Sequence, residues 1–261
     1  TGNRFEFRAV GSSDNCAEAM IVLNTAMAYE LTEFRKKVDA KIEAGMKKEK
    51  AIYEVLKQMI KACKAVRFDG NGYSDEWKAE AERRGLLNLK STVEALPYFV
   101  SEKNVALFTK HKIFTEKELH SRYEILLENY SKTINIEALT MVEMMKKDFF
   151  PAICTYVKKL ADTALAKKAL AGTISCELEE SIVTKISSLS GCLYKKTEAL
   201  EAAILGAKEY TQAKELADYF HDTVFSAMQE LRAVADEIEV LIGEEALPYP
   251  TYGQLLFGSA N

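Results

Sequence analysis

Apolar side chains recur every three or four residues along most of the chain between Thr115 and Leu241. This spacing places them on one side of an α-helix, so it predicts long amphipathic helices that bury that side against one another. Pro151 is the only proline in this stretch, and the whole chain of 261 residues holds four prolines and twelve glycines. Because short turns make neighbouring helices antiparallel, the pattern predicts a mainly α-helical fold with a bundle of long antiparallel helices.

The helix boundaries follow from capping and breaking residues. Thr115 and Glu118 form a capping box, Pro97 is expected to end a brief helix, and Pro151 is expected to kink or interrupt a long one. The predicted helices cover residues 16–44, 48–65, a short stretch around Trp77, 92–96, 115–170, 176–208 and 211–242. In the second of these, the residues expected to face inward are Ile52, Val55, Leu56, Met59 and Ile60.

Residues 3–10 have a different period, because Arg4, Glu6 and Arg8 alternate with two phenylalanines. In a strand, alternate side chains share a face, so the three charges would form one row. An acid between two guanidinium groups suits a substrate that carries both a cation and phosphate oxygens. The spacing alone is more typical of an exposed strand face whose charges pair with a neighbouring strand.

We therefore predict three regions and one residual strand. Residues 1–113 would hold the N-terminal β-strand and helical elaborations of a larger domain, and residues 114–243 the long-helix bundle. Residues 244–261, with two prolines, would form an extended tail docked on a core. The chain opens with Thr and directly into strand, which is typical of a piece of a longer protein.

Composition excludes several classes of protein. The net charge of −4 offers no electrostatic argument for nucleic-acid binding. Five cysteines, without a CxxC pair, favour reduced thiols in a cytoplasmic protein over disulfides or a zinc site. Neither a signal peptide nor an apolar run of 18 residues occurs, so we expect no membrane span.

For several isolated polar groups, an ordinary structural role is favoured over a functional one. The loop around Asp69 and Asn71 mimics a calcium loop but lacks its central glycine. His120 and His221 have acidic neighbours four or three residues away, as solvated helices commonly do. Cys16 is expected to be a small buried residue, and the basic stretch from Arg35 to Lys50 a solvated helix face.

The opening TGNRFEFRAVGSS resembles the last catalytic strand of glutamine synthetases, specifically the large bacterial type III form. Four further segments resemble the type III C-terminal region in the same order. They are FDGNGYSDEW (68–77), AERRGLLNLKSTVEALP (81–97), SRYEILLENYSKTINIEALTM (121–141) and LPYPTYGQLLF (247–257).

This resemblance implies an ATP-dependent ligation of ammonia to L-glutamate through γ-glutamyl phosphate, with Mg²⁺ or Mn²⁺ as the metal. Glu6 matches a metal-binding glutamate, Arg4 would face the nucleotide phosphates, and Arg8 the bound glutamate or the transferred phosphate. It also implies a large cytoplasmic homo-oligomer, with the other metal ligands and the ATP and ammonia sites in a catalytic domain upstream. We therefore expect the isolated chain to be inactive.

Periodicity alone would favour a non-enzymatic helical scaffold or oligomerisation module, because most of the chain is amphipathic helix. The two interpretations are compatible if the bundle builds an oligomer while the strand serves catalysis. A substitution of Glu6 in the full-length enzyme would distinguish them.

Overall fold

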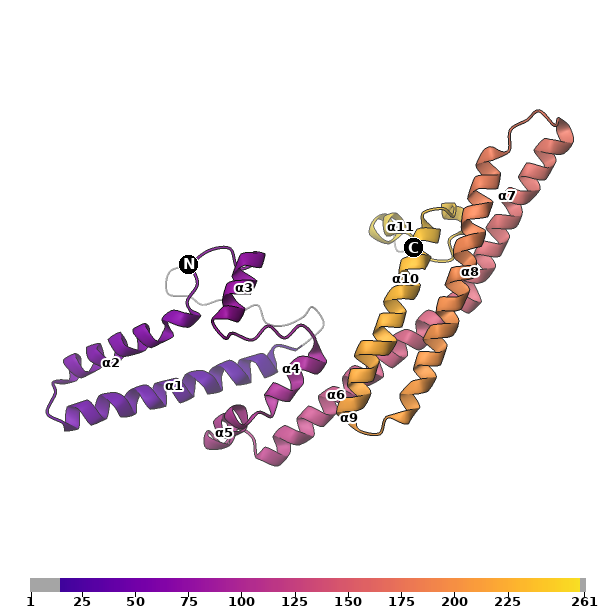
Figure 1. Ribbon diagram of the computed structural model, residues 1–261. Coiled ribbons are helices and arrows are strands. Elements are labelled where there is room, and N and C mark those ends of the chain that lie inside the picture. The colour runs from indigo at the N-terminus through magenta and orange to yellow at the C-terminus, as the bar shows by residue number, and fades with distance from the viewer. Residues whose placement is uncertain (1–14, 259–261) are drawn as a thin grey trace. The chain divides into compact units, whose positions relative to one another are not determined.

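The computed structural model describes residues 15–258, and helices make up the regular structure of this part of the chain (Figure 1). The predicted mainly α-helical fold is therefore confirmed. The predicted strand at residues 3–10 lies outside the described residues and stays a prediction. No helix within residues 15–258 is long and apolar enough to cross a membrane.

The long helices follow the predicted ranges, but two short helices, at residues 102–110 and 252–257, were not predicted. In chain order they are α1 Ala17–Glu43, α2 Lys48–Ala62, α3 Asp75–Arg83, α4 Thr92–Phe99, α5 Glu102–Lys110, α6 Glu116–Met144, α7 Phe150–Leu170, α8 Glu177–Gly206, α9 Ala213–Tyr219, α10 Ser226–Glu239 and α11 Tyr252–Phe257. Short 3₁₀ turns occupy Cys63–Val66, Ala207–Glu209 and Glu244–Ala246, and π-helical turns occupy Met145–Phe149 and Phe220–Phe225.

The chain divides into two compact units, residues 1–123 and 124–261. In the first, α1 and α2 form a hairpin that turns at Gly45, whose φ of +92° suits glycine. Its small core contains Val38, Ala51 and Val55, packed against Phe34 and neighbouring side chains. The capping box that begins α6 forms as predicted, because the backbone N–H of Glu118 donates to the Thr115 hydroxyl and the Glu118 carboxylate accepts from Thr115.

The prediction that Leu56 and Ile60 face inward is wrong, because they are 44% and 56% exposed. Val55 is buried against α1, and Leu56 is the next residue, about 100° further round the helix. Ile60 follows it one turn later on the same flank. The described residues of this unit leave that flank open, so α2 carries a second apolar side that its own hairpin does not use.

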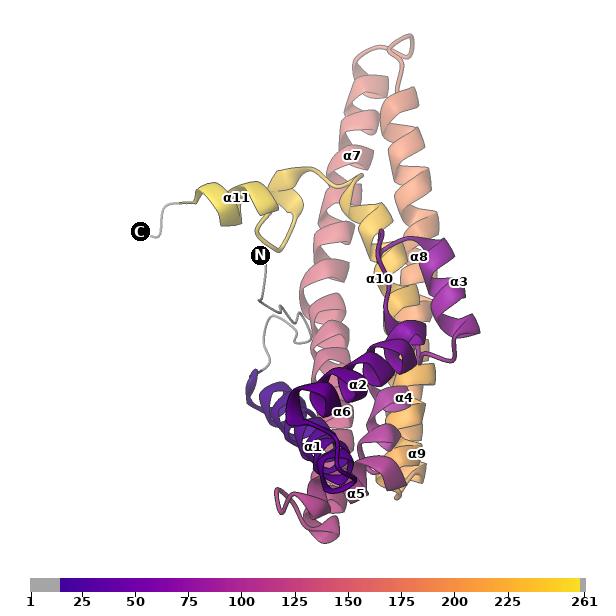
Figure 2. The same cartoon turned by 90° about the vertical axis from the view of Figure 1, so that its left-hand side faces the viewer.

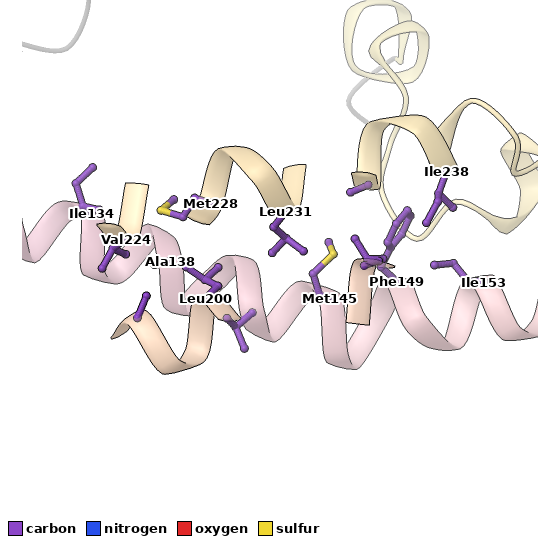
Figure 3. Packing of buried hydrophobic residues seen from close by; sticks show 14 of the residues in the cluster. Ile134, Ala138, Met145, Phe149, Ile153, Leu200, Val224, Met228, Leu231 and Ile238 are labelled. Carbon is purple, nitrogen blue, oxygen red and sulfur yellow. The ribbon is translucent and has the colours of Figure 1, made fainter. Parts of the chain in front are cut away.

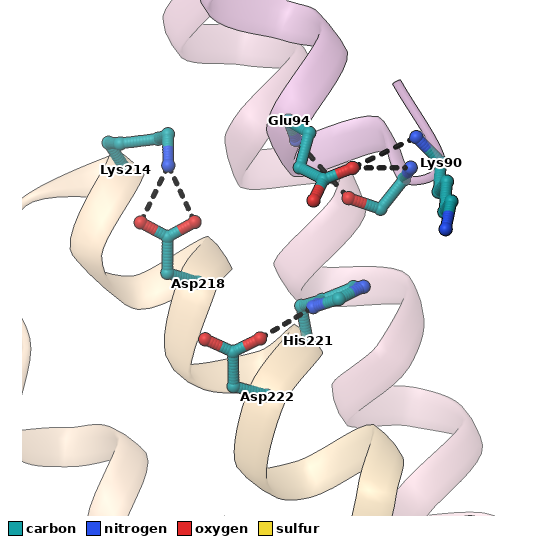
Figure 4. Close-up of polar contacts among 7 residues, drawn as sticks. Lys90, Glu94, Lys214, Asp218, His221 and Asp222 are labelled. Carbon is teal, nitrogen blue, oxygen red and sulfur yellow. Dashed lines mark hydrogen bonds and ion pairs between the residues drawn. The ribbon is translucent and has the colours of Figure 1, made fainter. Parts of the chain in front are cut away.

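Two smaller predictions in this unit also fail. The helix expected to end before Pro97 continues through it to Phe99. A complete capping box between Ser91 and Glu94 begins α4 (Figure 4), and the proline removes only one hydrogen bond from a helix that ends two residues later. Cys16, expected to be buried, is exposed at the start of α1.

In the second unit, α7 and α8 run side by side and α10 packs along α8 (Figures 1 and 2). The core lies where these helices and the C-terminal part of α6 meet (Figure 3). Fully buried side chains in this core include Ala138, Phe149, Ile186, Leu193, Leu200, Val224, Leu231 and Ile238. Ion pairs such as Lys167–Glu179 and Lys168–Glu180 join α7 to α8, and Lys196–Glu230 joins α8 to α10.

The π turn at Met145–Phe149 explains how one helical rod keeps its apolar side facing the core. The buried positions from Ile134 to Ile153 recur over five intervals and lie nineteen residues apart, whereas five α-turns advance by only eighteen. The π turn absorbs the extra residue. Pro151 follows in the first turn of α7, so the predicted interruption takes the form of a π turn rather than a break.

The first part of the tail packs on this core through Tyr249. The Tyr249 hydroxyl donates a 3.1 Å hydrogen bond to the carbonyl of Met144, just before the π turn, and its ring stacks 6.2 Å from that of Phe149. Burial raises the pKa of Tyr249 to about 12, with the charges of Asp148 and Glu239 adding to the effect. The extended form does not continue to the end, because a capping box between Thr251 and Gln254 begins α11.

Candidate functional site

The three predicted site residues, Arg4, Glu6 and Arg8, lie outside the described residues. Their arrangement, and any metal or phosphate contact they make, therefore stays a prediction. Within residues 15–258, a cluster of polar and aromatic contacts lies in the loop 67–74 and the helix α3 that follows it. This loop is part of the segment FDGNGYSDEW.

Arg84 holds the two ends of this loop region together. Its Nη1 donates to the carbonyl oxygens of Ala65 at 3.3 Å and Arg67 at 3.0 Å, and its Nε donates to Glu80 at 2.6 Å. Its guanidinium carbon lies 5.2 Å from the centre of the Trp77 ring. Arg84 therefore binds the backbone before the loop and the helix after it.

The loop itself also packs on the Trp77 ring. Phe68 stacks on Trp77 with ring centres 3.7 Å apart. Gly70 has a φ of +151°, and a Cβ there would come within 2.9 Å of the Phe68 ring. Glycine at position 70 therefore lets the backbone pass close to the ring, and the loop folds back onto α3.

A forked contact joins Arg83 to the same carboxylate that Arg84 binds. Arg83 donates through Nε and Nη2 to the two carboxylate oxygens of Glu80, at 2.6 and 2.7 Å. These bonds, followed by that of Arg84, hold the pKa of Glu80 at about 2. The Glu80 carboxylate is therefore charged at any physiological pH.

Arg84→Ala is expected to loosen the loop, and Arg83→Ala is the matched control. Both arginines bind Glu80, but only Arg84 reaches the carbonyl groups of Ala65 and Arg67. We expect hydrogen exchange of the amides at 67–74 to become roughly tenfold faster in Arg84→Ala. Arg83→Ala should leave it unchanged. Equal exchange in the two variants would show that Arg84 does not hold the loop.

The other candidate polar groups have ordinary partners. The side chain of Asn71 accepts from the backbone N–H of Tyr73 at 3.0 Å, which is a local turn contact. His221 Nδ1 lies 2.7 Å from Asp222, and Asp218 instead binds Lys214 through both oxygens (Figure 4). Between residues 15 and 258 no three His, Cys, Asp or Glu side chains come together as a set able to hold a metal ion.

Known proteins resemble this chain along nearly all of its length. Residues 51–168 match the family described as the glutamine synthetase C-terminal domain. The chain is 42% identical over 262 residues to a glutamine synthetase from Butyrivibrio fibrisolvens and 37% identical over 265 residues to one from Bacteroides fragilis. Residues 51–168 of the chain are therefore similar to the glutamine synthetase C-terminal domain.

The alignments cover nearly all of this chain but only part of each relative. A type-3 glutamine synthetase from Dictyostelium discoideum is 33% identical over 264 residues. Each of the three alignments covers 98% of this chain but only 35–36% of the relative. The chain thus spans about a third of the length of these glutamine synthetases, and the predicted resemblance to the type III form is confirmed.

Sequence reasoning did not find the role of Arg84, although the residue lies within a segment quoted for the resemblance. A signal was available, because Trp77, Glu80 and Arg84 have i, i+3 and i+7 spacing on one side of a helix. The contacts with Ala65 and Arg67 could not be predicted from residue spacing, because they depend on how the loop closes around Gly70.

Proposed function

We propose that this chain is the C-terminal part of a type III glutamine synthetase, which joins ammonia to L-glutamate at the expense of ATP. The observation that carries the proposal is the similarity to glutamine synthetases over 98% of the chain. The activity belongs to the whole protein, because the relatives are about three times as long as this chain. The isolated chain is not expected to turn over.

In this proposal the opening row of charges forms one wall of the active site. Glu6 binds a divalent cation, Mg²⁺ or Mn²⁺, because hard cations prefer carboxylate oxygens. Arg4 faces the phosphates of ATP, and Arg8 faces the bound glutamate or the transferred phosphate. Arginine suits both positions, because its planar donors match phosphate and carboxylate and stay charged at any relevant pH.

The donor set of this chain fits such a cation only in part. Glu6 supplies one carboxylate, whereas these sites usually draw on several. Across residues 15–258 there is no cluster of three candidate ligands to add to it. The remaining ligands, and the ATP and ammonia sites, are therefore assigned to the rest of the longer protein.

The reaction proceeds in two steps. The side-chain carboxylate of glutamate attacks the terminal phosphorus of ATP, which releases ADP and gives γ-glutamyl phosphate. Ammonia then attacks the acyl carbon, loses a proton and displaces inorganic phosphate to give glutamine. Arg4 and Arg8 stabilise the negative charge that develops on the transferring phosphoryl oxygens, and the cation adds to that stabilisation when it is bound.

The scaffold interpretation remains as the second candidate, favoured by the predominance of amphipathic helix in residues 15–258. It concerns the same protein, since a helical C-terminal region can assemble a cytoplasmic homo-oligomer whose catalytic sites lie elsewhere. The two functions are separated by whether a residue of this chain contributes to turnover.

Glu6→Ala in the full-length enzyme tests that contribution. We expect glutamine formation to fall by at least about 100-fold and Mn²⁺ binding to weaken, because one carboxylate ligand is lost. Glu18→Ala is the matched control, since Glu18 is an exposed acid on α1 whose carboxylate lies 3.8 Å from Arg122. If both variants made glutamine at the parent rate, Glu6 would have no part in the mechanism.

A further inference from the structure

The second unit contains an apolar groove lined with methionines. It lies between α6, α10 and the start of the tail, has a volume of about 450 Å³, and is lined by Met141, Met144, Met145, Met228 and Leu231 among others. Met145, Met228 and Leu231 appear in Figure 3. A hollow of about 770 Å³ continues it toward Val240 and Leu255. Unbranched methionines adapt to the shape of an incoming apolar side chain, so this groove suits a protein segment.

The rim of the groove has an excess of negative charge. Glu137, Asp236 and Glu239 line it together with a single cation, Arg232. Arg232 Nε lies 3.4 Å from Asp236, so its charge is already partly matched. Partial burial, followed by the charge of Asp236, raises the pKa of Glu239. A partner with lysines beside its apolar side chains would relieve this repulsion.

Such a surface exists on α2 in the first unit. Tyr53, Leu56 and Ile60 are 61%, 44% and 56% exposed, and their i, i+3, i+7 spacing places them on one side of the helix. Lysines follow along the adjacent side at 50, 57, 61 and 64. The Nζ of Lys57 lies 5.8 Å from the centre of the Tyr53 ring. None of these four lysines has a carboxylate partner within the described part of the chain.

The two units also carry opposite net charges, positive in the unit that contains α2 and negative in the unit that contains the groove. Residues 1–123 hold 22 Lys and Arg against 18 Asp and Glu, whereas residues 124–261 hold 13 against 21. Opposite net charges on two units favour contact between unlike units of different molecules and oppose contact between like ones. A partner for the groove is therefore present in every other copy of this chain.

We propose that the apolar and basic side of α2 in one copy docks in the methionine groove of a second copy. Tyr53, Leu56 and Ile60 would enter the groove, and Lys57 and Lys61 would meet the carboxylates of its rim. The lengths agree, since α2 from Lys50 to Ile60 and α10 from Met228 to Val240 span about 15 and 18 Å at 1.5 Å per residue. The contact is heterologous, so repetition of it builds a ring or a chain of subunits.

Two complementary variants of the chain test this contact by sedimentation velocity. Leu56→Glu with Ile60→Glu removes the α2 surface, and Asp236→Lys with Glu239→Lys reverses the groove rim. The wild-type chain should associate as its concentration rises, and each variant alone should associate at least tenfold more weakly. An equimolar mixture should form a 1:1 dimer and stop there, because the mixture retains one intact α2 surface and one intact groove.

Matched controls and a charge exchange complete the test. Met20→Glu with Met27→Glu removes comparable exposed apolar side chains of α1, and Glu237→Lys with Glu245→Lys makes the same charge change outside the groove. Both controls should associate like the wild type, and circular dichroism should show native helicity in every variant.

The charge exchange uses Lys57→Glu with Lys61→Glu on α2, which should restore association only with the reversed groove. A wild-type chain that stays monomeric, or a mixture that stays monomeric while the wild type associates, would overturn the proposal. So would self-association of either defective variant alone at wild-type strength. The readout is mass, so the outcome is independent of whether the parent protein makes glutamine.

Discussion

Leu193→Asp is expected to unfold the second unit, residues 124–261. Leu193 lies on α8 with none of its surface exposed, in the core that α8 shares with α7 and α10. A carboxylate there would have no partner, and burying an unpaired charge costs several kcal/mol against a typical domain stability of about 5–15 kcal/mol. Circular dichroism at pH 7 should show a large loss of helix, and calorimetry the loss of the main unfolding transition.

Leu205→Asp on the same helix is the matched control. Leu205 is 60% exposed, so its replacement leaves the charge in water and should change the free energy of unfolding by no more than about 0.5 kcal/mol. A Leu193→Asp variant that unfolds at the temperature of the Leu205→Asp variant would show that α8 is not buried at position 193. The position of the core between α7, α8 and α10 would then be wrong.

The sequence predicts helix type and extent well, because periodicity is a local property of the chain. Leu193 and Leu200 belong to the predicted apolar stripe of residues 176–208, and both are fully buried. Leu178 continues the same stripe and is 68% exposed. Periodicity identifies the apolar side of a helix, but how far that side is covered depends on where the neighbouring helices end. Leu56 and Ile60 were misjudged for the same reason.

The π turns could not be predicted from propensity. The signal at Met145–Phe149 is the spacing of buried residues between Ile134 and Ile153, which exceeds an α-helical period by one residue. That spacing becomes visible only when the buried residues are known, since several other apolar side chains of the segment are exposed, among them Ile136 and Leu139. Pro151 marks the region without specifying the form of the irregularity.

Part of the candidate site could be predicted from the sequence, and part of it could not. The row Arg4, Glu6 and Arg8 comes from alternation and from the family resemblance, and its role is a proposal that the Glu6→Ala experiment tests. The Arg84 contacts are non-local, since they join residues 17 and 19 positions apart. The exposed apolar side of α2 was not predicted, and the groove proposed to receive it combines α6 with α10 and the tail, which lie more than 80 residues further along the chain.

Phe149→Ala is expected to destabilise the second unit by about 3–5 kcal/mol. Phe149 is fully buried as the last residue of a π turn, and its ring stacks on Tyr249 of the tail. Removing the ring costs its transfer free energy and leaves a cavity that a helical rod cannot easily close. Urea unfolding followed by circular dichroism should show a lower midpoint with little change in slope.

Phe225→Ala is the matched control, because Phe225 is also the last residue of a π turn and is 37% exposed. Its loss should cost about 1 kcal/mol or less, since much of the ring already contacts water. Equal losses in the two variants would mean that the π turns themselves, rather than the burial of Phe149, set the stability of the unit. A larger loss in Phe149→Ala would show that the buried Phe149 ring, against which the Tyr249 ring of the tail packs, contributes to the stability of the unit.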